Sequence, residues 1–392
     1  MQEKNGKGLP LRSDVIVVGC GPAGSLASLE AARKGVEVLV LEEHKVVGEP
    51  DHCAGLVSVS GLKKLGLRVP EECVLNEVYG ARFFSPSGID FTVRRGTPQA
   101  FVLDRRAFDK WLASLAHDSG AHIVLGERAT SLRVKAGEAT VTVKGEWEAR
   151  GKVVVDAEGC RGKIARLAGL PRPGRRVPAV QYEVTGVDVD RDFVELHFER
   201  ALAPGFFAWV IPTKDGARIG LGAISQPRKR LEAFMRKRGF SCARIIRRTA
   251  GTIITGGPVR RTYASHVVTV GDAAGQVKQT TGGGVVVGGL CAKIAGQVVA
   301  DAILRDDVSR LVKYQQLWKK ILGKEFFYMG LARKFLDKIS DRGLDGLFRA
   351  IREQGGVEIL ESYGDMDFEA VALKKLLASP RTLLTAITYM LT

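Results

Sequence analysis

The sequence predicts an α/β fold, α+β overall, in which a parallel-sheet domain holds an inserted antiparallel sheet and is followed by helices. Short β-branched runs at residues 15–18, 153–156 and 267–270 each lead into a turn containing glycine and are typical of strands buried on both faces of a parallel sheet. Between the last two runs, residues 193–198 and 208–212 resemble antiparallel strands. We therefore expect a parallel-sheet domain assembled from separated pieces of the chain.

Length and composition indicate a folded protein of more than one domain. The chain has 392 residues, of which 45% are hydrophobic and 26% charged. Its net charge of +16 is concentrated at 161–176 and 228–261, while the rest is neutral. A local basic surface suits nucleic acid, anionic lipid or a phosphorylated substrate, or is simply a solvated face. Aromatic residues are sparse in 228–261, so we expect no nucleic-acid partner.

The cysteines and the apolar segments exclude several classes. The six cysteines form no C-x-x-C pair, so we expect no zinc or iron–sulfur site and no other metal. No signal peptide is recognisable, which favours free thiols and a cytoplasmic location. The apolar run 285–304 contains Lys293 and several glycines, which favours a buried helix over a membrane span.

The first strand opens into a dinucleotide-binding turn of the Rossmann type. The turn reads Gly19-Cys-Gly21-Pro22-Ala23-Gly24 and is followed by a predicted helix to residue 34 and a strand at 36–41. Gly19 permits the tight turn, Gly21 lets the backbone approach a pyrophosphate, and Gly24 lets helix and strand pack. Pro22 and Ala23 begin a helix whose N–H groups would hold the anion. Glu42, or alternatively Glu43, would accept ribose hydroxyls.

A second glycine-rich segment follows the strand at 267–270. It contains Asp272 and, before a long helix, Gly282, Gly283 and Gly284. Together with the first turn it resembles flavoproteins of the para-hydroxybenzoate hydroxylase type. The resemblance implies FAD, with Asp272 on the ribityl chain and the long helix pointing at the pyrimidine end of the flavin. It also implies a phosphate contact for Arg105, with Arg106 as competitor and a surface salt bridge as the alternative. A glycine loop needed only for packing is the alternative for the second segment.

Two further segments are similar to the geranylgeranyl reductase family. Residues 50–57, with Cys53, Ala54 and Gly55, resemble the family's P-x-x-C-x-G-x-V segment beside the flavin, and 204–212 resembles its pocket motif P-x-x-Y-x-W-x-F-P. The chain departs from the family at three positions: Phe207 replaces tyrosine, Ile211 replaces phenylalanine, and Glu158 stands where related flavoproteins have aspartate. A pocket hydroxyl is therefore missing, and nicotinamide docking near residue 158 is not inherited.

The resemblance implies the division of the chain. We expect a split FAD-binding domain at 1–80, 101–172 and 259–308, a catalytic domain at 81–100 and 173–258, and a helical region at 309–392.

The resemblance also implies an FAD-dependent reductase that saturates isolated double bonds of geranylgeranyl chains, on archaeal membrane lipid precursors or on the diphosphate. Cys53, Phe207 and Trp209 would be catalytic, and Phe206, Phe207, Trp209 and Pro212 would line the substrate. His52 competes with Cys53 as acid or base, and an inert cysteine and plain aromatic core packing are the alternatives. The other functions open are a flavin-dependent monooxygenase or halogenase and a non-catalytic flavin-containing lipid-binding protein.

Several partners follow from that function. We expect an isoprenoid lipid substrate and, as electron donor, NAD(P)H or a reduced ferredoxin-like protein. We also expect peripheral contact with a membrane surface, because bases are attracted to anionic lipid. The apolar residues of the tail would cover the substrate tunnel or lie on the bilayer; they are Leu383, Leu384, Ile387, Met390 and Leu391.

Overall fold

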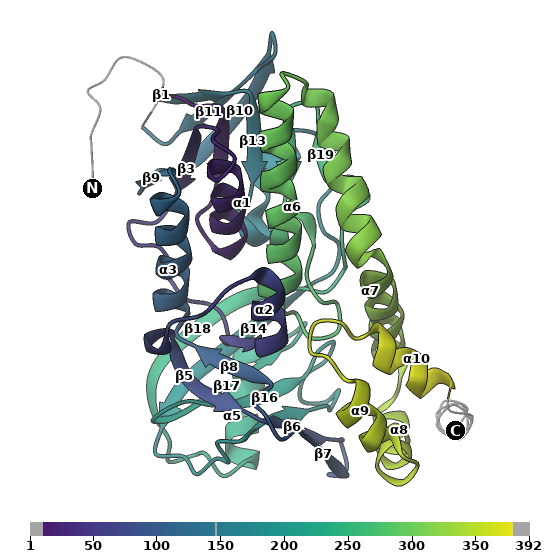
Figure 1. The fold of residues 1–392 in the computed structure, drawn as a ribbon. Coiled ribbons are helices and arrows are strands. Elements are labelled where there is room, and N and C mark those ends of the chain that lie inside the picture. The colour runs from purple at the N-terminus through teal and green to yellow at the C-terminus, as the bar shows by residue number, and fades with distance from the viewer. Residues whose placement is uncertain (1–10, 146, 379–392) are drawn as a thin grey trace. The chain divides into compact units, whose positions relative to one another are not determined.

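A computed structural model describes residues 11–145 and 147–378, which fall into two compact units (Figure 1). Unit 1 comprises Met1–Pro50, Arg105–Arg175 and Ile254–Phe326, and unit 2 comprises Asp51–Asp104, Arg176–Ile253 and Phe327–Thr392. The expected three-part division stays a prediction. Of its segments, 51–80 and 101–104 belong to unit 2, and 173–175, 254–258 and 309–326 belong to unit 1. The expected apolar tail at 383–391 lies outside the described residues.

Unit 1 is built on a six-stranded sheet in the order β19-β20-β13-β2-β3-β9. Its strands are β2 (Val15–Val18), β3 (Val38–Glu42), β9 (His122–Leu125), β13 (Val153–Asp156), β19 (Tyr263–Ala264) and β20 (Val267–Thr269). All neighbours are parallel except β19 and β20. The β-branched runs therefore lie side by side, so that β2, β13 and β20 end at one edge of the sheet, as expected for a dinucleotide-binding domain.

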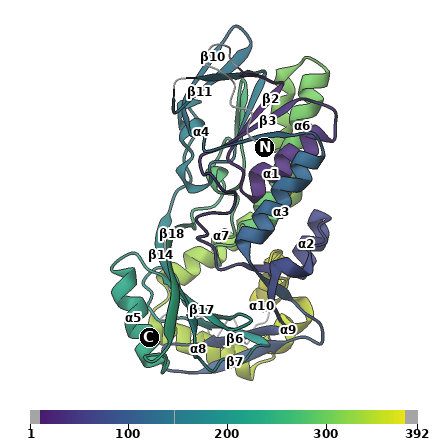
Figure 2. The same cartoon turned by 90° about the vertical axis from the view of Figure 1, so that its left-hand side faces the viewer.

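Helices and a smaller sheet complete the core of unit 1. Helix α1 (Pro22–Ala32) packs against both α3 (Arg105–Asp118) and α6 (Val285–Leu304), as Figure 2 also shows. In the described part of the chain, α6 is the helix long and apolar enough to cross a membrane, but 72% of its most apolar window is buried in the protein. This burial matches the expectation of a core helix. The smaller sheet has the order β1-β12-β11-β10, and α4 (Lys163–Leu167) packs on β10.

The smaller sheet contains β1 (Leu11–Arg12), β10 (Ala129–Lys135), β11 (Glu138–Val143) and β12 (Glu148–Gly151). Strands β9 and β10 are neighbours in the chain but lie in different sheets. Gly126 lies between them with a φ of 78°, a left-handed conformation that favours glycine and turns the chain.

Unit 2 is built on a seven-stranded sheet in the order β18-β14-β17-β16-β15-β6-β7. The strands are β6 (Gly80–Phe84), β7 (Asp90–Arg94), β14 (Arg176–Thr185), β15 (Phe193–His197), β16 (Ala208–Pro212), β17 (Gly216–Gly222) and β18 (Arg244–Ile254). Strands β6 and β7 form an antiparallel hairpin. The pairing is mainly antiparallel, but β15 and β6 run parallel.

The two faces of this sheet bury different clusters. Helix α5 (Pro227–Lys237) covers one face (Figure 2). Its Leu231 and Phe234 belong to the same buried cluster as Ile219 and Leu221. The other face carries Trp209 and Ile211 together with residues of a three-stranded sheet. That sheet has the order β4-β8-β5, from β4 (Leu56–Ser58), β5 (Val74–Val78) and β8 (Ala100–Leu103).

The remaining helices lie mostly in the second half of the chain. They are α2 (Val59–Leu65), α7 (Val312–Lys338), α8 (Asp341–Glu353), α9 (Gly356–Tyr363) and α10 (Ala370–Ala378). Helices α8 and α9 contact β7, where Phe348 packs against Phe91 with ring centroids 5.2 Å apart. The expected helical character of the C-terminal region is therefore present in the described residues.

Candidate active site

The turn after β2 has the close packing that its glycines predict. Gly19 has a φ of 100°, and a Cβ there would lie 2.4 Å from the carbonyl oxygen of Ala157. A Cβ on Gly24 would lie 1.9 Å from the carbonyl oxygen of Gly19. At Gly21, by contrast, an added Cβ would meet no atom of the described chain within 4 Å. The turn is thus tight on its inner side and leaves room at Gly21, which is where a pyrophosphate would approach.

The start of α1 leaves donors available beside this space. Gly21 is the N-cap residue and offers no side chain to the helix, and proline stands at the first turn as Pro22. The N–H groups of the first turn, including those of Ala23 and Gly24, are therefore not capped by a side chain at this N-cap. Such an end binds anions.

Glu42 lies at the end of β3 and is held against the turn. Its Oε2 accepts a hydrogen bond from the backbone N–H of Cys20 at 2.8 Å, and its Oε1 accepts one from the N–H of His44 at 2.9 Å. The carboxylate therefore already orients the dinucleotide turn. Glu43, the alternative, forms ion pairs with Arg161 and Arg128.

The second glycine-rich segment, which contains Asp272, lies against the start of α1. An added Cβ on Gly271 would lie 2.9 Å from Cβ of Ala23, which brings the residue before Asp272 against α1. A Cβ on Gly284 would lie 2.8 Å from Oδ1 of Asp272, so the glycine makes room for the carboxylate. Burial raises the pKa of Asp272, and the positive charge of Arg105 acts in the opposite direction. The sequence-predicted residues Asp272 and Arg105 thus interact.

The loop before α6 is closed on itself. The N–H of Gly282 donates to the carbonyl of Lys278 at 2.8 Å, and the N–H of Lys278 donates to the carbonyl of Gly283 at 3.0 Å. A Cβ on Gly283 would lie 2.6 Å from Cε of Lys278. Gly282 has a φ of 75°, a left-handed conformation that favours glycine, so the fold of the loop itself accounts for this residue.

Two buried glutamines beside this loop were not expected from the sequence. Gln276 accepts from the N–H of Gly271 at 3.0 Å and donates to the Tyr314 hydroxyl at 2.8 Å. Gln279 is buried, and its Oε1 has no hydrogen-bond partner in the described part of the chain. A buried acceptor without a partner is costly unless a ligand or water satisfies it.

Arg105 begins α3 and is engaged with Asp109. Its Nε and Nη2 each donate to a carboxylate oxygen of Asp109 at 2.8 Å. The side chains are only 12% and 7% exposed, so the pair is largely buried, unlike the surface salt bridge named as the alternative. Contact between Arg105 and a phosphate stays a prediction.

In unit 2, a chain of hydrogen bonds joins the two segments that resemble the reductase motifs. The indole N–H of Trp209 donates to Oε1 of Gln181 at 3.0 Å, and Nε2 of Gln181 donates to the carbonyl of Cys53 at 3.4 Å. Gln181 and Trp209 both face Gly220 across neighbouring strands, so their side chains share one face of the sheet. Sequence reasoning missed Gln181.

Two glycines of β17 leave room for the aromatic rings of Trp209 and Phe206. A Cβ on Gly220 would lie 2.5 to 2.8 Å from three atoms of the Trp209 ring. A Cβ on Gly222 would lie 2.8 Å from the Phe206 ring. The glycines in 216–222 were the sequence signal that could have predicted this packing, because a glycine within a strand often marks a place where another group lies close to the backbone.

The aromatic residues of 204–212 are buried and stacked. Phe206 and Phe207 stack with ring centroids 4.2 Å apart, and Phe207 meets Trp209 edge to face at 6.1 Å. Phe198, not expected from the sequence, packs on Phe207 at 5.3 Å. Pro212 ends β16 and is also buried. These residues are part of the core, so substrate contact remains a proposal for them.

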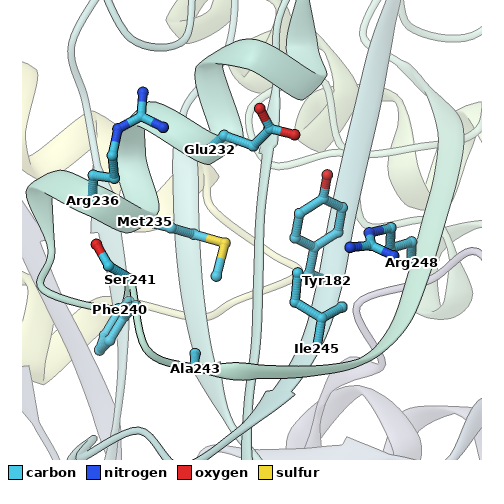
Figure 3. A pocket seen from close by; sticks show the side chains of 9 residues that line it. All are labelled: Tyr182, Glu232, Met235, Arg236, Phe240, Ser241, Ala243, Ile245 and Arg248. Atoms are coloured by element: carbon cyan, nitrogen blue, oxygen red, sulfur yellow. The ribbon is translucent and has the colours of Figure 1, made fainter.

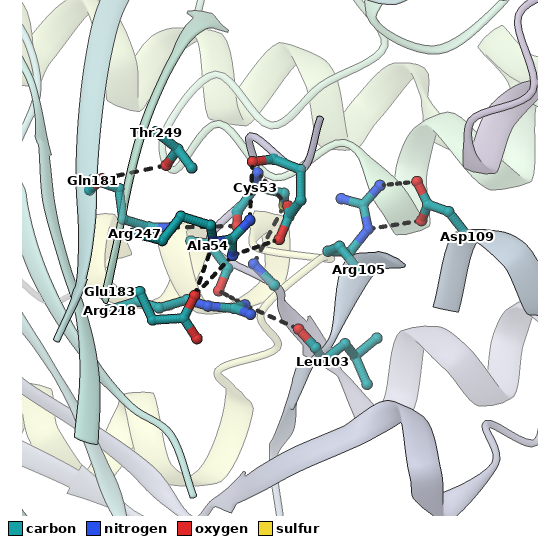
Figure 4. A network of polar contacts seen from close by, with 12 residues as sticks. Cys53, Ala54, Leu103, Arg105, Asp109, Gln181, Glu183, Arg218, Arg247 and Thr249 are labelled. Atoms are coloured by element: carbon teal, nitrogen blue, oxygen red, sulfur yellow. Dashed lines mark hydrogen bonds and ion pairs between the residues drawn. The ribbon is translucent and has the colours of Figure 1, made fainter. Parts of the chain in front are cut away.

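The segment with Cys53 is held by charged residues of β14 and β18. Arg247 donates to Asp51 and to Glu183, both at 2.9 Å, and Asp51 in turn accepts from the N–H of Cys53 at 3.0 Å (Figure 4). Sγ of Cys53 accepts from the N–H of Gly55 at 3.4 Å. The Cys53 thiol is half-buried, with its backbone fixed on both sides.

Arg218 fixes the other end of that segment. Its side chain is buried, and Nη1 donates to the carbonyls of Ala54 and Leu103, both at 2.9 Å. A Cβ on Gly55, whose φ is 78°, would lie 2.3 Å from that Nη1. The glycine of P-x-x-C-x-G is therefore required by the arginine beneath it.

Some residues of the basic segments form internal ion pairs. In 228–261, these are Arg228, Lys237, Arg238 and Arg247, which have carboxylate partners. Two others, Arg236 and Arg248, line a hollow of about 290 Å³ (Figure 3). The remaining lining residues are Tyr182, Glu232, Met235, Phe240, Ser241, Ala243 and Ile245. Because neighbouring strand residues face opposite sides, Tyr182 places the hollow on the sheet face opposite Gln181.

Comparison with known proteins identifies the family. The digeranylgeranylglycerophospholipid reductase 2 of Methanothermobacter thermautotrophicus is 37% identical over 357 residues, which cover 87% of this chain and 92% of that protein. The digeranylgeranylglycerophospholipid reductase of Methanocaldococcus jannaschii is 34% identical and covers 87% and 90%. The chain belongs to the digeranylgeranylglycerophospholipid reductase family. The predicted family resemblance is confirmed.

Family models and solved structures agree with this membership. Residues 14–182 match the model "FAD dependent oxidoreductase", 176–253 match "Geranylgeranyl reductase catalytic domain", and 223–353 match "Lycopene cyclase protein". The first match confirms the prediction of FAD.

A geranylgeranyl bacteriochlorophyll reductase-like protein from Thermoplasma acidophilum has a TM-score of 0.88 at 26% identity, covering 97% of this chain and all of that one. A flavin-dependent brominase has a TM-score of 0.70 at 18% identity and covers 96% and 98%, which shows a shared fold alone.

Proposed function

We propose that this chain is an FAD-dependent reductase that saturates isolated double bonds of geranylgeranyl chains, on glycerophospholipid precursors of archaeal membranes or on geranylgeranyl diphosphate. The observation that carries the proposal is the hydrogen-bonded chain from Trp209 through Gln181 to Cys53. It joins the two segments that resemble the motifs of the geranylgeranyl reductase family. Membership in the reductase family supports the same activity.

FAD fits the residues of unit 1. The open space at Gly21 and the α1 N–H groups would receive the pyrophosphate, and Glu42 would accept ribose hydroxyls while holding Cys20. Asp272 makes no side-chain hydrogen bond to the described residues and would accept from the ribityl chain. The unpaired Oε1 of Gln279 is a further acceptor for the bound cofactor.

An isolated alkene has no carbonyl that a protein could polarise, so the reaction depends on alignment and on the exclusion of water. When bound and reduced, FAD supplies a hydride, and one proton completes the addition of two hydrogen atoms. Phe206, Phe207 and Trp209 provide an apolar aromatic wall that tolerates transient positive charge on the chain. Cys53 Sγ, held beside the Gly55 N–H, is the proposed proton source, with His52 as the alternative.

The partners belong to the same proposal. Electrons would come from NAD(P)H or from a reduced ferredoxin-like protein, and Glu158 gives no support for a nicotinamide site because its carboxylate accepts from the N–H of Ile164 at 2.6 Å. The enzyme would work in the cytoplasm at the membrane surface, where its lipid substrate resides.

The test is anaerobic reoxidation of photoreduced holoenzyme. Adding a geranylgeranylated glycerophospholipid should restore the absorbance of oxidised flavin, while the fully saturated lipid should leave it reduced. Failure of both lipids to reoxidise an enzyme that holds FAD would contradict the proposal. Turnover that needs oxygen and raises the product mass by the mass of one oxygen atom, instead of two hydrogen atoms, would support the monooxygenase alternative; a gain of one halogen in place of a hydrogen would support the halogenase alternative.

A further inference from the structure

Helix α7 exposes four large apolar side chains along one side. Leu317, Ile321, Phe327 and Leu331 are 41%, 57%, 62% and 43% exposed. At about 100° per residue these positions fall within an arc of about 120° on the helix. We call these four residues the α7 stripe. Scattered single apolar residues are normal on a protein surface, but four in one line are not.

Lysines share the arc of the stripe. Lys313, Lys320 and Lys324 are exposed, lie between the apolar positions, and have no carboxylate partner among the described residues. The other exposed charged residues of α7 are also lysines, at positions 319, 334 and 338. The helix therefore presents an apolar surface with positive charge and no exposed acid, the composition of a helix that lies in a membrane interface.

Charge decides between the possible partners of this surface. A second copy packed symmetrically on the stripe would set these lysines against their equivalents, which is unfavourable. The segment 379–392 contains apolar residues and Arg381 but no acid, so it offers the lysines no partner either. An anionic bilayer supplies both a phosphate layer for the lysines and an acyl boundary for the apolar side chains.

We infer that α7 docks this protein on the surface of an anionic lipid bilayer, with the stripe in the headgroup and acyl boundary and Lys313, Lys320 and Lys324 at lipid phosphates. This inference rests on the proposed function, because an enzyme that acts on a membrane lipid must bind at the membrane to reach its substrate. The docking geometry itself stands on the exposed residues of one continuous helix.

The test is sedimentation of the FAD-loaded protein with vesicles, measured without reductant so that turnover plays no part. Binding should be strong with phosphatidylglycerol vesicles, weak with phosphatidylcholine vesicles, and should fall as salt rises. K313Q/K320Q/K324Q should lower the partition coefficient about 100-fold, at about fivefold per lysine. I321N/F327N should lower it at least tenfold and still do so in high salt.

A matched control removes the same charge elsewhere. Lys34, Lys135 and Lys144 are exposed on unit 1 outside α7, and K34Q/K135Q/K144Q should bind within about threefold of the wild type. Equal loss in both triple variants would show a non-specific charge effect and overturn the inference. Loss of binding after truncation at residue 378, with the α7 variants unchanged, would assign docking to the segment 379–392 instead.

A change in oligomeric state would also overturn the inference. If I321N/F327N converts a dimer into a monomer by light scattering, the stripe is a contact between copies. Because vesicle binding is read without reductant, these outcomes stand even if no alkene is reduced. The α7 variants should also reduce detergent-dispersed lipid at the wild-type rate. That result would show that the variants have lost membrane docking and have kept the proposed catalytic activity.

Discussion

Gly220→Ala is the substitution that most directly perturbs the aromatic wall. The added methyl would lie 2.5 Å from Cζ2, 2.6 Å from Cε2 and 2.8 Å from Nε1 of Trp209. Carbon atoms in contact prefer about 3.5 to 4.0 Å, so the ring must move by about 1 Å. Trp209 is 8% exposed and belongs to a buried apolar cluster, which limits how far its ring can move.

The magnitude follows from that displacement. The bond from the indole N–H to Gln181, now 3.0 Å, would lengthen beyond hydrogen-bond range. Overpacking costs about 1 to 3 kcal/mol, and leaving a buried donor unpaired costs about 1 to 3 kcal/mol more. For the reaction, misplacing a group by about 1 Å lowers the rate by about 100-fold.

The assay is single-turnover reduction of a geranylgeranylated lipid by prereduced enzyme, with stability followed by urea unfolding. Gly96→Ala is the matched control, because a Cβ there meets no described atom within 4 Å. We expect Gly96→Ala to keep its rate and Gly220→Ala to lose about 100-fold. A folded Gly220→Ala enzyme with an unchanged rate would refute the role given to Trp209.

Three more predictions test other parts of the account. Asp272→Ala should weaken FAD binding about 30-fold in a fluorescence titration, and unchanged affinity would remove Asp272 from the cofactor site. Gln181→Leu should lower kcat at least tenfold, because it leaves the buried indole N–H of Trp209 without its acceptor, and an unchanged kcat would contradict the role given to Gln181.

The third concerns Glu195, where burial raises the pKa but hydrogen bonds from His197 and Arg238 outweigh it and lower the value to about 2. The stability from this group is present above the unfolded pKa near 4.5 and is lost as pH falls toward 2. Glu195→Gln should therefore cost about 2 to 3 kcal/mol of unfolding free energy at pH 7 and much less near pH 2, and a pH-independent loss would contradict this.

The parts of the site that depend on local backbone geometry could be predicted from the sequence. A Gly-x-Gly-x-x-Gly turn after a β-branched strand allows few structures, and Gly19 and Gly24 make the close contacts expected of them. Asp272 could be placed because its strand and the following helix leave it at the same sheet edge.

The side chains that join distant segments could not be predicted. Gln181 and Arg218 lie on β14 and β17, and each holds backbone of the segment around Cys53, more than a hundred residues away in the chain. A lone glutamine or arginine in a strand carries no local signal of burial. The role of the basic segments could not be predicted either. Arg247, for example, forms ion pairs with Asp51 and Glu183, and these residues come together only in the folded protein.

The mass of the lipid product tests the central claim most directly. Holoenzyme supplied with a chemical reductant and a geranylgeranylated glycerophospholipid should yield products heavier by two daltons per saturated bond, with the head group unchanged. The increments should persist without oxygen and should be lost first in Gly220→Ala. A lipid recovered at its starting mass from FAD-loaded, reduced enzyme, or one that gains only oxygen, would contradict the assignment of this chain as a geranylgeranyl-chain reductase.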